Sequence, residues 1–235
     1  MASRTCLYVG ATLLFQTLAA CSPSGDSAAA PSSPRDGATS VPAVAATAAD
    51  EKLIVAFGDS LYAGYKLGPN EGFAPQLEAA LDEDDVPSRV INAGVSGDTS
   101  AAGRQRLAFT LDGLERRPDL VLVGLGGNDM LRGIDPAQTR ANIDAILAEL
   151  KRRDIPAMLT GMLAAPNLGP DYREGFEVIY PDLARKYDVP LYPFILDGVL
   201  GRSNMMLGDG LHPSAEGVRA IADRIAPEIG AALVR

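Results

Sequence analysis

The chain has 235 residues, 47% of them hydrophobic, which is enough to bury the core of one domain. Its formal net charge is −9, and residues 51–235 carry −8 of it, because residues 1–50 hold two arginines against three aspartates. An acidic domain argues against a nucleic-acid partner, whose phosphate backbone it would repel. Both cysteines, Cys6 and Cys21, precede the region expected to fold, which excludes a disulfide or a cysteine ligand there. The single histidine leaves that region without a convincing metal site.

Residues 1–20 have the pattern of an export signal, with Arg4 at its positive start and an apolar run too short to span a bilayer. The run ends in Leu-Ala-Ala before Cys21, which resembles the lipobox of bacterial lipoproteins. The resemblance implies cleavage before Cys21, lipid on its sulfur and anchoring of the exported chain at a membrane. Ser22, and not an aspartate, follows Cys21. This resembles the pattern of lipoproteins that Gram-negative bacteria sort to the outer membrane, where they face the periplasm. An ordinary secretory signal with an unrelated cysteine is the alternative.

Residues 21–50 are mostly small or polar and cannot bury enough apolar surface to fold, so a disordered tether is expected there. Residues 51–235 are expected to form one domain. In chain order, the pattern predicts a strand at 53–57, a helix at 73–81, a strand at 89–92, a helix from 100 to about 107, a strand at 120–123, a helix from 136 to 150, a strand at 157–160, a helix around 176–187, a strand at 191–195 and a helix from 214 to 233. This alternation predicts a three-layer α/β/α sandwich around a parallel sheet of about five strands.

Polar groups follow three of the expected strands. Ser60 follows the first strand, Gly97 the second and Asn128 the third, and the carboxyl ends of parallel strands meet at one edge of a sheet. The last helix is preceded by Asp209 and by His212, the only histidine in the chain. An aspartate three residues before a histidine can hold one ring nitrogen and leave the other free as a base. A last helix that returns along the sheet would bring this pair to Ser60.

These residue types are the ones that acyl transfer requires. A serine hydroxyl is a weak nucleophile until a base takes its proton. The Gly97 backbone N–H and the Asn128 side-chain amide can donate hydrogen bonds to an oxyanion. Taken one at a time, each position has a plain explanation as a turn or capping residue. The functional interpretation depends on all of them meeting at one edge of the sheet.

The segments that carry these residues resemble the four blocks of the SGNH (GDSL) hydrolase superfamily, in the same order and with similar spacing. They read Gly-Asp-Ser-Leu at 58–61, Gly97, Gly-Gly-Asn-Asp at 126–129 and Asp-Gly-Leu-His at 209–212. Segments 92–100 and 125–133 further resemble the arylesterase branch, which includes the bacterial thioesterase I/lysophospholipase L1 enzymes. The resemblance covers about residues 53–232 and implies a flavodoxin-like sheet.

The resemblance implies a serine esterase that needs no cofactor. Ser60 would attack the acyl carbonyl, His212 would take its proton, and Asp209 would orient the imidazole. The Ser60 and Gly97 backbone N–H groups and the Asn128 side chain would hold the oxyanion. Activity is expected to fall below about pH 6 as His212 takes up a proton.

In the branch that the chain resembles, the loops after the third and fourth strands shape the acyl pocket. In this chain, the resemblance implies an acyl pocket lined by Met130, Leu131, Met162 and Leu163. Their apolar side chains suit an alkyl or aromatic acyl group of a small-molecule or lipid ester. An acetyl-carbohydrate esterase of the same superfamily is one alternative. A lipoprotein domain that binds an envelope partner without catalysis is another.

Overall fold

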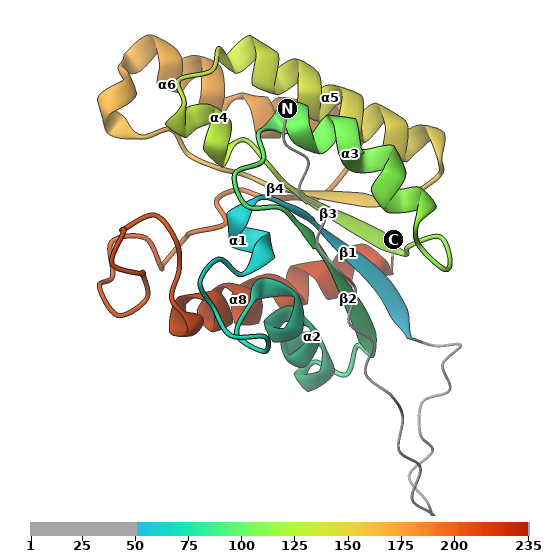
Figure 1. Ribbon diagram of the computed structural model, residues 1–235. Coiled ribbons are helices and arrows are strands. Elements are labelled where there is room, and N and C mark those ends of the chain that lie inside the picture. The colour runs from blue at the N-terminus through green and yellow to red at the C-terminus, as the bar shows by residue number, and fades with distance from the viewer. Residues whose placement is uncertain (1–50, 235) are drawn as a thin grey trace, which may run out of the picture. The chain divides into compact units, whose positions relative to one another are not determined.

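The computed structural model describes residues 51–234, which form an α/β fold around one parallel sheet (Figure 1). The strands are β1 (Lys52–Gly58), β2 (Ser88–Gly94), β3 (Leu120–Gly124), β4 (Ala157–Thr160) and β5 (Leu191–Tyr192). Their order in the sheet is β2-β1-β3-β4-β5, and every neighbouring pair is parallel. This is the flavodoxin-like order, so the predicted sheet is confirmed.

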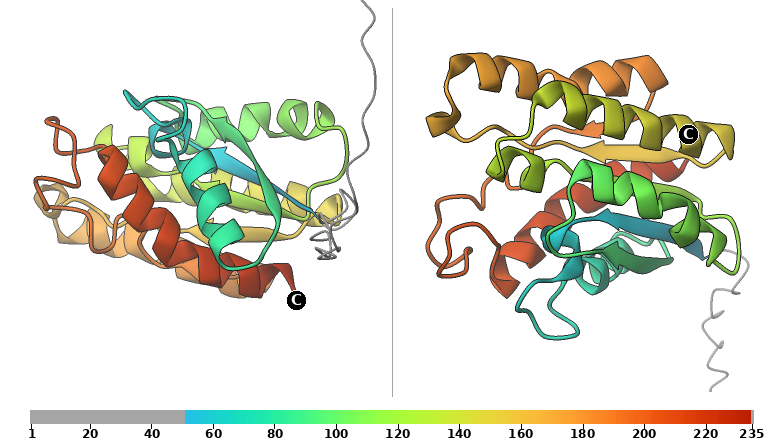
Figure 2. Two further views of the ribbon diagram at one scale, coloured as in Figure 1. Left: turned by 90° about the horizontal axis from the view of Figure 1, so that it is seen from below. Right: turned by 45° about the horizontal axis from the view of Figure 1, so that its top comes forward.

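Helices cover both faces of the sheet (Figures 1 and 2). They are α1 (Ser60–Ala63), α2 (Phe73–Glu83), α3 (Ser100–Asp112), α4 (Gly127–Leu131), α5 (Pro136–Arg152), α6 (Pro170–Glu177), α7 (Ile179–Tyr187) and α8 (Ala215–Leu233), with a 3₁₀ turn, η1, at Pro166–Leu168. Helices α2 and α8 pack against one face, and α3, α5 and α7 pack against the other. The three-layer α/β/α arrangement is therefore confirmed.

The central strand β1 contributes to two separate cores. Ile54 and Ala56 pack in the core beneath α2 and α8, whereas Val55 and Phe57 pack in the core beneath α3, α5 and α7. All four side chains are fully buried, because successive residues of a strand point to opposite faces and both faces are covered. This explains the unbroken apolar run that predicted the strand.

The structure differs from the sequence-based prediction after β4. The helix expected over 176–187 is two helices that meet at Val178, because Pro181 has no N–H to donate to the Glu177 carbonyl, as a continuous helix would require. The strand expected to reach residue 195 ends at Tyr192, just before Pro193, which also lacks the N–H. The loop expected after the fourth strand contains η1 and the start of α6.

Two short helices at the carboxyl ends of strands were not predicted. Helix α1 follows β1 and α4 follows β3, and each has only four or five residues. A helix of about one turn is too short to display an apolar period, so the pattern could not indicate it. Helix α3 is also longer than predicted, since it ends at Asp112 and not near residue 107.

The expected signal and tether, with the lipidation site Cys21, lie outside the described residues. Within residues 51–234, no helix is both long enough and apolar enough to cross a membrane. The same part of the chain contains no group of three or more His, Cys, Asp or Glu side chains placed to hold a metal ion.

Candidate active site

Ser60 is the first residue of α1, two residues beyond the end of β1. The Asp59 carboxylate caps this helix by accepting the Leu61 N–H at 3.1 Å. Gly64 ends the helix in the left-handed conformation, at a φ of 74°. As the first helical residue, Ser60 has a backbone N–H with no partner inside the helix. The hydroxyl and this N–H therefore lie together at the edge of the sheet.

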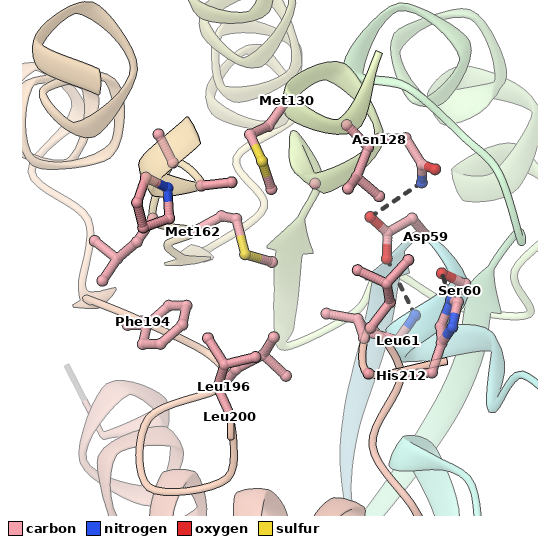
Figure 3. Close-up of a pocket in the computed structure, with 18 of the residues that line it drawn as sticks. Asp59, Ser60, Leu61, Asn128, Met130, Met162, Phe194, Leu196, Leu200 and His212 are labelled. Atoms are coloured by element: carbon pink, nitrogen blue, oxygen red, sulfur yellow. Dashed lines mark hydrogen bonds between the residues drawn. The ribbon is translucent and has the colours of Figure 1, made fainter. Parts of the chain in front are cut away.

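His212 lies between Ser60 and Asp209, although 152 residues separate it from Ser60 in the chain. Figure 3 shows the His212 ring beside Ser60. Its Nε2 is 2.9 Å from Ser60 Oγ, and its Nδ1 is 3.0 Å from Asp209 Oδ2. Asp209 Oδ1 accepts the backbone N–H groups of His212 and Leu211, at 3.0 Å each. These backbone hydrogen bonds, together with the His212 side chain, hold the pKa of Asp209 well below its usual range, so this carboxylate is charged at neutral pH. The structure thus brings the three residues together.

Asn128 and Gly97 approach from two further strand ends. Asn128 lies in α4, and its Nδ2 donates to the Asp98 backbone oxygen at 3.0 Å and to Asp59 Oδ2 at the longer distance of 3.4 Å. Gly97 has a φ of 87°, a conformation that favours glycine. Its carbonyl accepts a hydrogen bond from Arg132 Nη2 at 2.7 Å. Both residues are held in place by hydrogen bonds between the segment after β2 and helix α4 with its C-terminal end.

Two residues close to Ser60 belong to the site although the sequence analysis did not single them out. Asp59 is only 3% exposed, and burial raises its pKa to about 6. Tyr65 lies against the imidazole of His212, with the ring centroids 4.4 Å apart. Asp59 stands inside the Gly-Asp-Ser-Leu segment, but nothing local shows that it is buried. No sequence pattern links Tyr65 to His212.

A cavity of about 590 Å³ lies beside Ser60 and His212 (Figure 3). Most of its wall is apolar and comes from α4 and from the segments after β4 and β5. These apolar residues include Met130, Leu131, Met162, Leu163, Phe194, Leu196 and Leu200. The first four were expected, whereas the last three, which all follow β5, were not. Among residues 51–234, Asn128 is part of this lining and Gly97 is not.

The comparison with known families agrees with this geometry. Residues 56–220 match the model of the GDSL-like lipase/acylhydrolase family. The chain belongs to this family. Over 184 residues, this hydrolase is 39% identical to thioesterase 1/protease 1/lysophospholipase L1 of Escherichia coli strain K12, which covers 78% of the chain and 85% of that protein. Over 185 residues it is 39% identical to an arylesterase of Vibrio mimicus, which covers 79% of the chain and 91% of that protein.

Solved structures place the hydrolase in the same group. It is 49% identical to AlinE4, an SGNH-hydrolase family esterase, with a TM-score of 0.67 over 78% of this chain and 97% of that chain. The predicted superfamily and its thioesterase and arylesterase branch are therefore confirmed. The protein is a carboxylic-ester hydrolase.

Proposed function

We propose that this hydrolase cleaves esters through an acyl-enzyme on Ser60, with His212 as the general base and Asp209 as the group that orients it. The observation that carries the proposal is the position of one imidazole, 2.9 Å from Ser60 Oγ at Nε2 and 3.0 Å from Asp209 Oδ2 at Nδ1. Both distances are within hydrogen-bond reach. A charged Asp209 favours the tautomer with its proton on Nδ1, which leaves the Nε2 lone pair directed at the hydroxyl.

The steps follow from where the proton can go. As Ser60 Oγ bonds to the acyl carbon, its proton passes to His212 Nε2 and the carbonyl oxygen becomes negative. When the bond from the acyl carbon to the leaving group breaks, the imidazolium donates that proton to the leaving atom. A water molecule then attacks the acyl-enzyme and loses its proton to His212. The imidazolium returns this proton to Ser60 Oγ as the acid leaves.

In this proposal the oxyanion is held by the Ser60 N–H, the Gly97 N–H and the Asn128 side chain. The three donors come from the segments that follow β1, β2 and β3. An amide nitrogen carries two hydrogens, and the one that Asn128 directs to the Asp98 oxygen fixes its orientation. The contact with Asp59 Oδ2 is long at 3.4 Å, so this second hydrogen is available to a closer negative oxygen.

The cavity supports a substrate with an alkyl or aromatic acyl group. Its wall is largely apolar, and an apolar acyl chain placed there leaves water without loss of hydrogen bonds. The relatives named thioesterase and arylesterase support both thioesters and oxygen esters as substrates. An acetylated carbohydrate would need polar partners for its hydroxyls. Hydrolysis of acetylated sugars without hydrolysis of p-nitrophenyl butyrate would favour that alternative.

Replacement of the nucleophile tests the mechanism. We expect Ser60→Ala to lower kcat for p-nitrophenyl butyrate by about 10³-fold or more, because the hydroxyl that His212 Nε2 contacts is removed. Circular dichroism should show an unchanged fold, and the exposed Ser203→Ala serves as the matched control. The wild-type protein should also be labelled by a fluorophosphonate. Full activity of Ser60→Ala would overturn the mechanism, and an unlabelled, inactive wild type would revive the binding-protein alternative.

We also propose that the hydrolase is exported and held at a membrane by lipid on Cys21, in the outer membrane of a Gram-negative cell. The support is the sequence of residues 1–22. Incorporation of labelled palmitate into the wild type and not into Cys21→Ser is the expected result. Equal labelling of the two proteins would overturn the proposal.

A further inference from the structure

Arg106 of α3 does not line the cavity, yet it contacts the backbone on which the site is built. Its Nε donates to Asp98 Oδ2 at 2.6 Å, and its Nη2 donates to the Gly58 backbone oxygen at 2.9 Å. The guanidinium carbon is 4.1 Å from the centre of the Phe57 ring, a cation–π contact. The side chains of Arg106 and Asp98 are only 21% and 13% exposed, so solvent screens this ion pair weakly.

These contacts join the three segments that carry the oxyanion donors. Gly58 lies two residues before Ser60 at the end of β1. Asp98 directly follows Gly97 in the segment after β2, and its backbone oxygen accepts the Asn128 Nδ2 hydrogen at 3.0 Å. The Arg106 guanidinium therefore contacts the end of β1 directly and the segment after β2 through the Asp98 carboxylate. It is connected to Asn128, after β3, through the backbone oxygen of Asp98.

We propose that Arg106 is a positioning residue that sets the geometry of the oxyanion hole. This inference rests on the acyl-enzyme function proposed above. An oxyanion hole is effective only when its donors converge within about 2.7–3.1 Å of one developing charge. The Val95 N–H donates to the Gly58 oxygen at 3.0 Å and so joins the segment after β2 to the end of β1 on one side of Gly97. The guanidinium adds a second connection on the other side of Gly97, from Asp98 to the same Gly58 oxygen.

The two hydrogen bonds require the shape of arginine. A guanidinium is planar and donates in two directions at once, one toward Asp98 and one toward Gly58, while its face lies on an aromatic ring. A lysine ammonium at this position keeps the charge but has neither the fork nor the planar face. Arg106→Lys therefore separates the geometric role of the side chain from its charge.

Arg153 provides a matched control. Its side chain is 23% exposed, close to the value for Arg106, and it also bridges two elements, with Nη1 2.5 Å from Asp112 of α3 and Nε 2.7 Å from Glu149 of α5. It does not line the cavity. Arg153→Lys thus loses a comparable set of hydrogen bonds away from the oxyanion donors.

The experiment measures kcat and KM for p-nitrophenyl butyrate per active site, with the active sites counted by fluorophosphonate titration. For Arg106→Lys we expect kcat to fall about 10- to 100-fold while KM stays within about twofold. Loss of one complete donor costs about 10²–10³-fold, and here the donors are displaced but present, with Arg132 still bound to the Gly97 carbonyl. Arg153→Lys should keep the wild-type kcat.

Three results would overturn the inference. The first is a wild-type kcat in folded Arg106→Lys, and the second is a loss of activity that matches the loss of titratable sites, as a purely structural role predicts. If Arg106→Lys does not fold, kcat of Asp98→Asn tests the inference instead. This variant keeps the backbone oxygen that accepts the Asn128 hydrogen and weakens only the ion pair with Arg106. A kcat lowered at least fivefold supports the inference, and an unchanged kcat is the third contrary result. Failure of the acyl-enzyme function itself is distinguishable, since the wild type would not be labelled and Ser60→Ala would stay active.

Discussion

Asp59 and Ser60 are neighbours in the chain but lie in different environments. Both residues line the cavity, but Ser60 is half-buried beside His212, whereas Asp59 is only 3% exposed. Burial raises the pKa of Asp59 from its ordinary value of 3.8 to about 6, with further contributions from the nearby carboxylates of Asp129 and Asp98. The Leu61 N–H and the charge of His212 act in the opposite direction but do not offset the burial.

This pKa predicts a pH-dependent stability. The folded state binds the Asp59 proton more tightly than the unfolded state does. The protonated carboxyl therefore contributes fully to the free energy of unfolding below about pH 4, and this contribution is lost as the pH rises through about 6. A shift of about two pKa units corresponds to about 3 kcal/mol. Asp59→Asn has no proton to lose, so its unfolding free energy should gain about 2 kcal/mol relative to wild type between pH 4 and pH 7, since part of the effect is already lost at pH 4.

Urea denaturation of both proteins at the two pH values measures this difference, in which the titrating groups that do not interact with Asp59 cancel. The exposed Asp84→Asn is the control and should follow the wild-type curve at both pH values. If the unfolding free energies of wild type and Asp59→Asn changed in parallel with pH, the raised pKa of the Asp59 carboxyl would be contradicted.

At the scale of elements, the position of α1 depends on three strands that end in glycine. The Tyr62 ring of α1 is buried, and its hydroxyl is 2.6 Å from Thr160 Oγ1 of β4. The helix lies across the ends of β1, β2 and β3, where side chains on Gly58, Gly94 and Gly124 would overlap Tyr62. A helix of four residues has little stability of its own, so this packing holds Ser60 at the edge of the sheet.

Gly124→Ala should displace α1. The added Cβ would lie 2.1 Å from Tyr62 Cε2, so the buried ring must move. We expect a loss of about 1–3 kcal/mol in unfolding free energy and a lower kcat, measured by urea denaturation and ester hydrolysis.

Gly230→Ala in α8 is the control for this prediction, because its Cβ would meet only Val86 Cγ2 at 3.6 Å. Its stability should stay the same or rise by up to about 1 kcal/mol, since alanine favours a helix over glycine. Equal stability and activity of Gly124→Ala and wild type would mean that the close approach of Tyr62 does not position α1.

At the scale of the whole molecule, the cavity is a product of the sheet topology. Its wall combines α4 and the segments after β1, β4 and β5 with the loop before α8. In a parallel sheet all carboxyl ends lie at one edge, so segments distant in the chain become neighbours there. The apolar wall and the Ser60–His212 pair come together only in the folded chain.

A charge in this wall should lower the affinity for long acyl chains. We expect Leu163→Asp to raise KM for p-nitrophenyl octanoate about tenfold and to leave p-nitrophenyl acetate nearly unchanged, because each buried methylene contributes about 0.8 kcal/mol and a charge disfavours its burial. Leu163 is 46% exposed, so the fold should tolerate the change.

Val178→Asp is the matched control, since Val178 is 43% exposed and does not line the cavity. It should leave the KM of both esters unchanged. If Leu163→Asp had the same KM as wild type for the octanoate, the acyl chain would have to bind elsewhere.

Local features in the chain predicted much of this protein. The unbroken apolar run of β1 indicated a strand buried on both faces, and the pattern over 136–150 indicated α5. The Gly-Asp-Ser-Leu and Asp-Gly-Leu-His segments pointed to a serine nucleophile and a histidine base. These signals are readable because backbone period, capping and motif spacing depend on residues close together in the chain.

Tertiary structure alone decided the remaining features. The burial of Asp59, the ring contact between Tyr65 and His212, and the contacts of Arg106 all join residues that no local pattern connects. The sequence by itself determined the elements of the sheet and the chemistry of the reacting groups. Only the fold determined their distances, their burial and the shape of the acyl cavity, because these quantities arise from packing between distant segments.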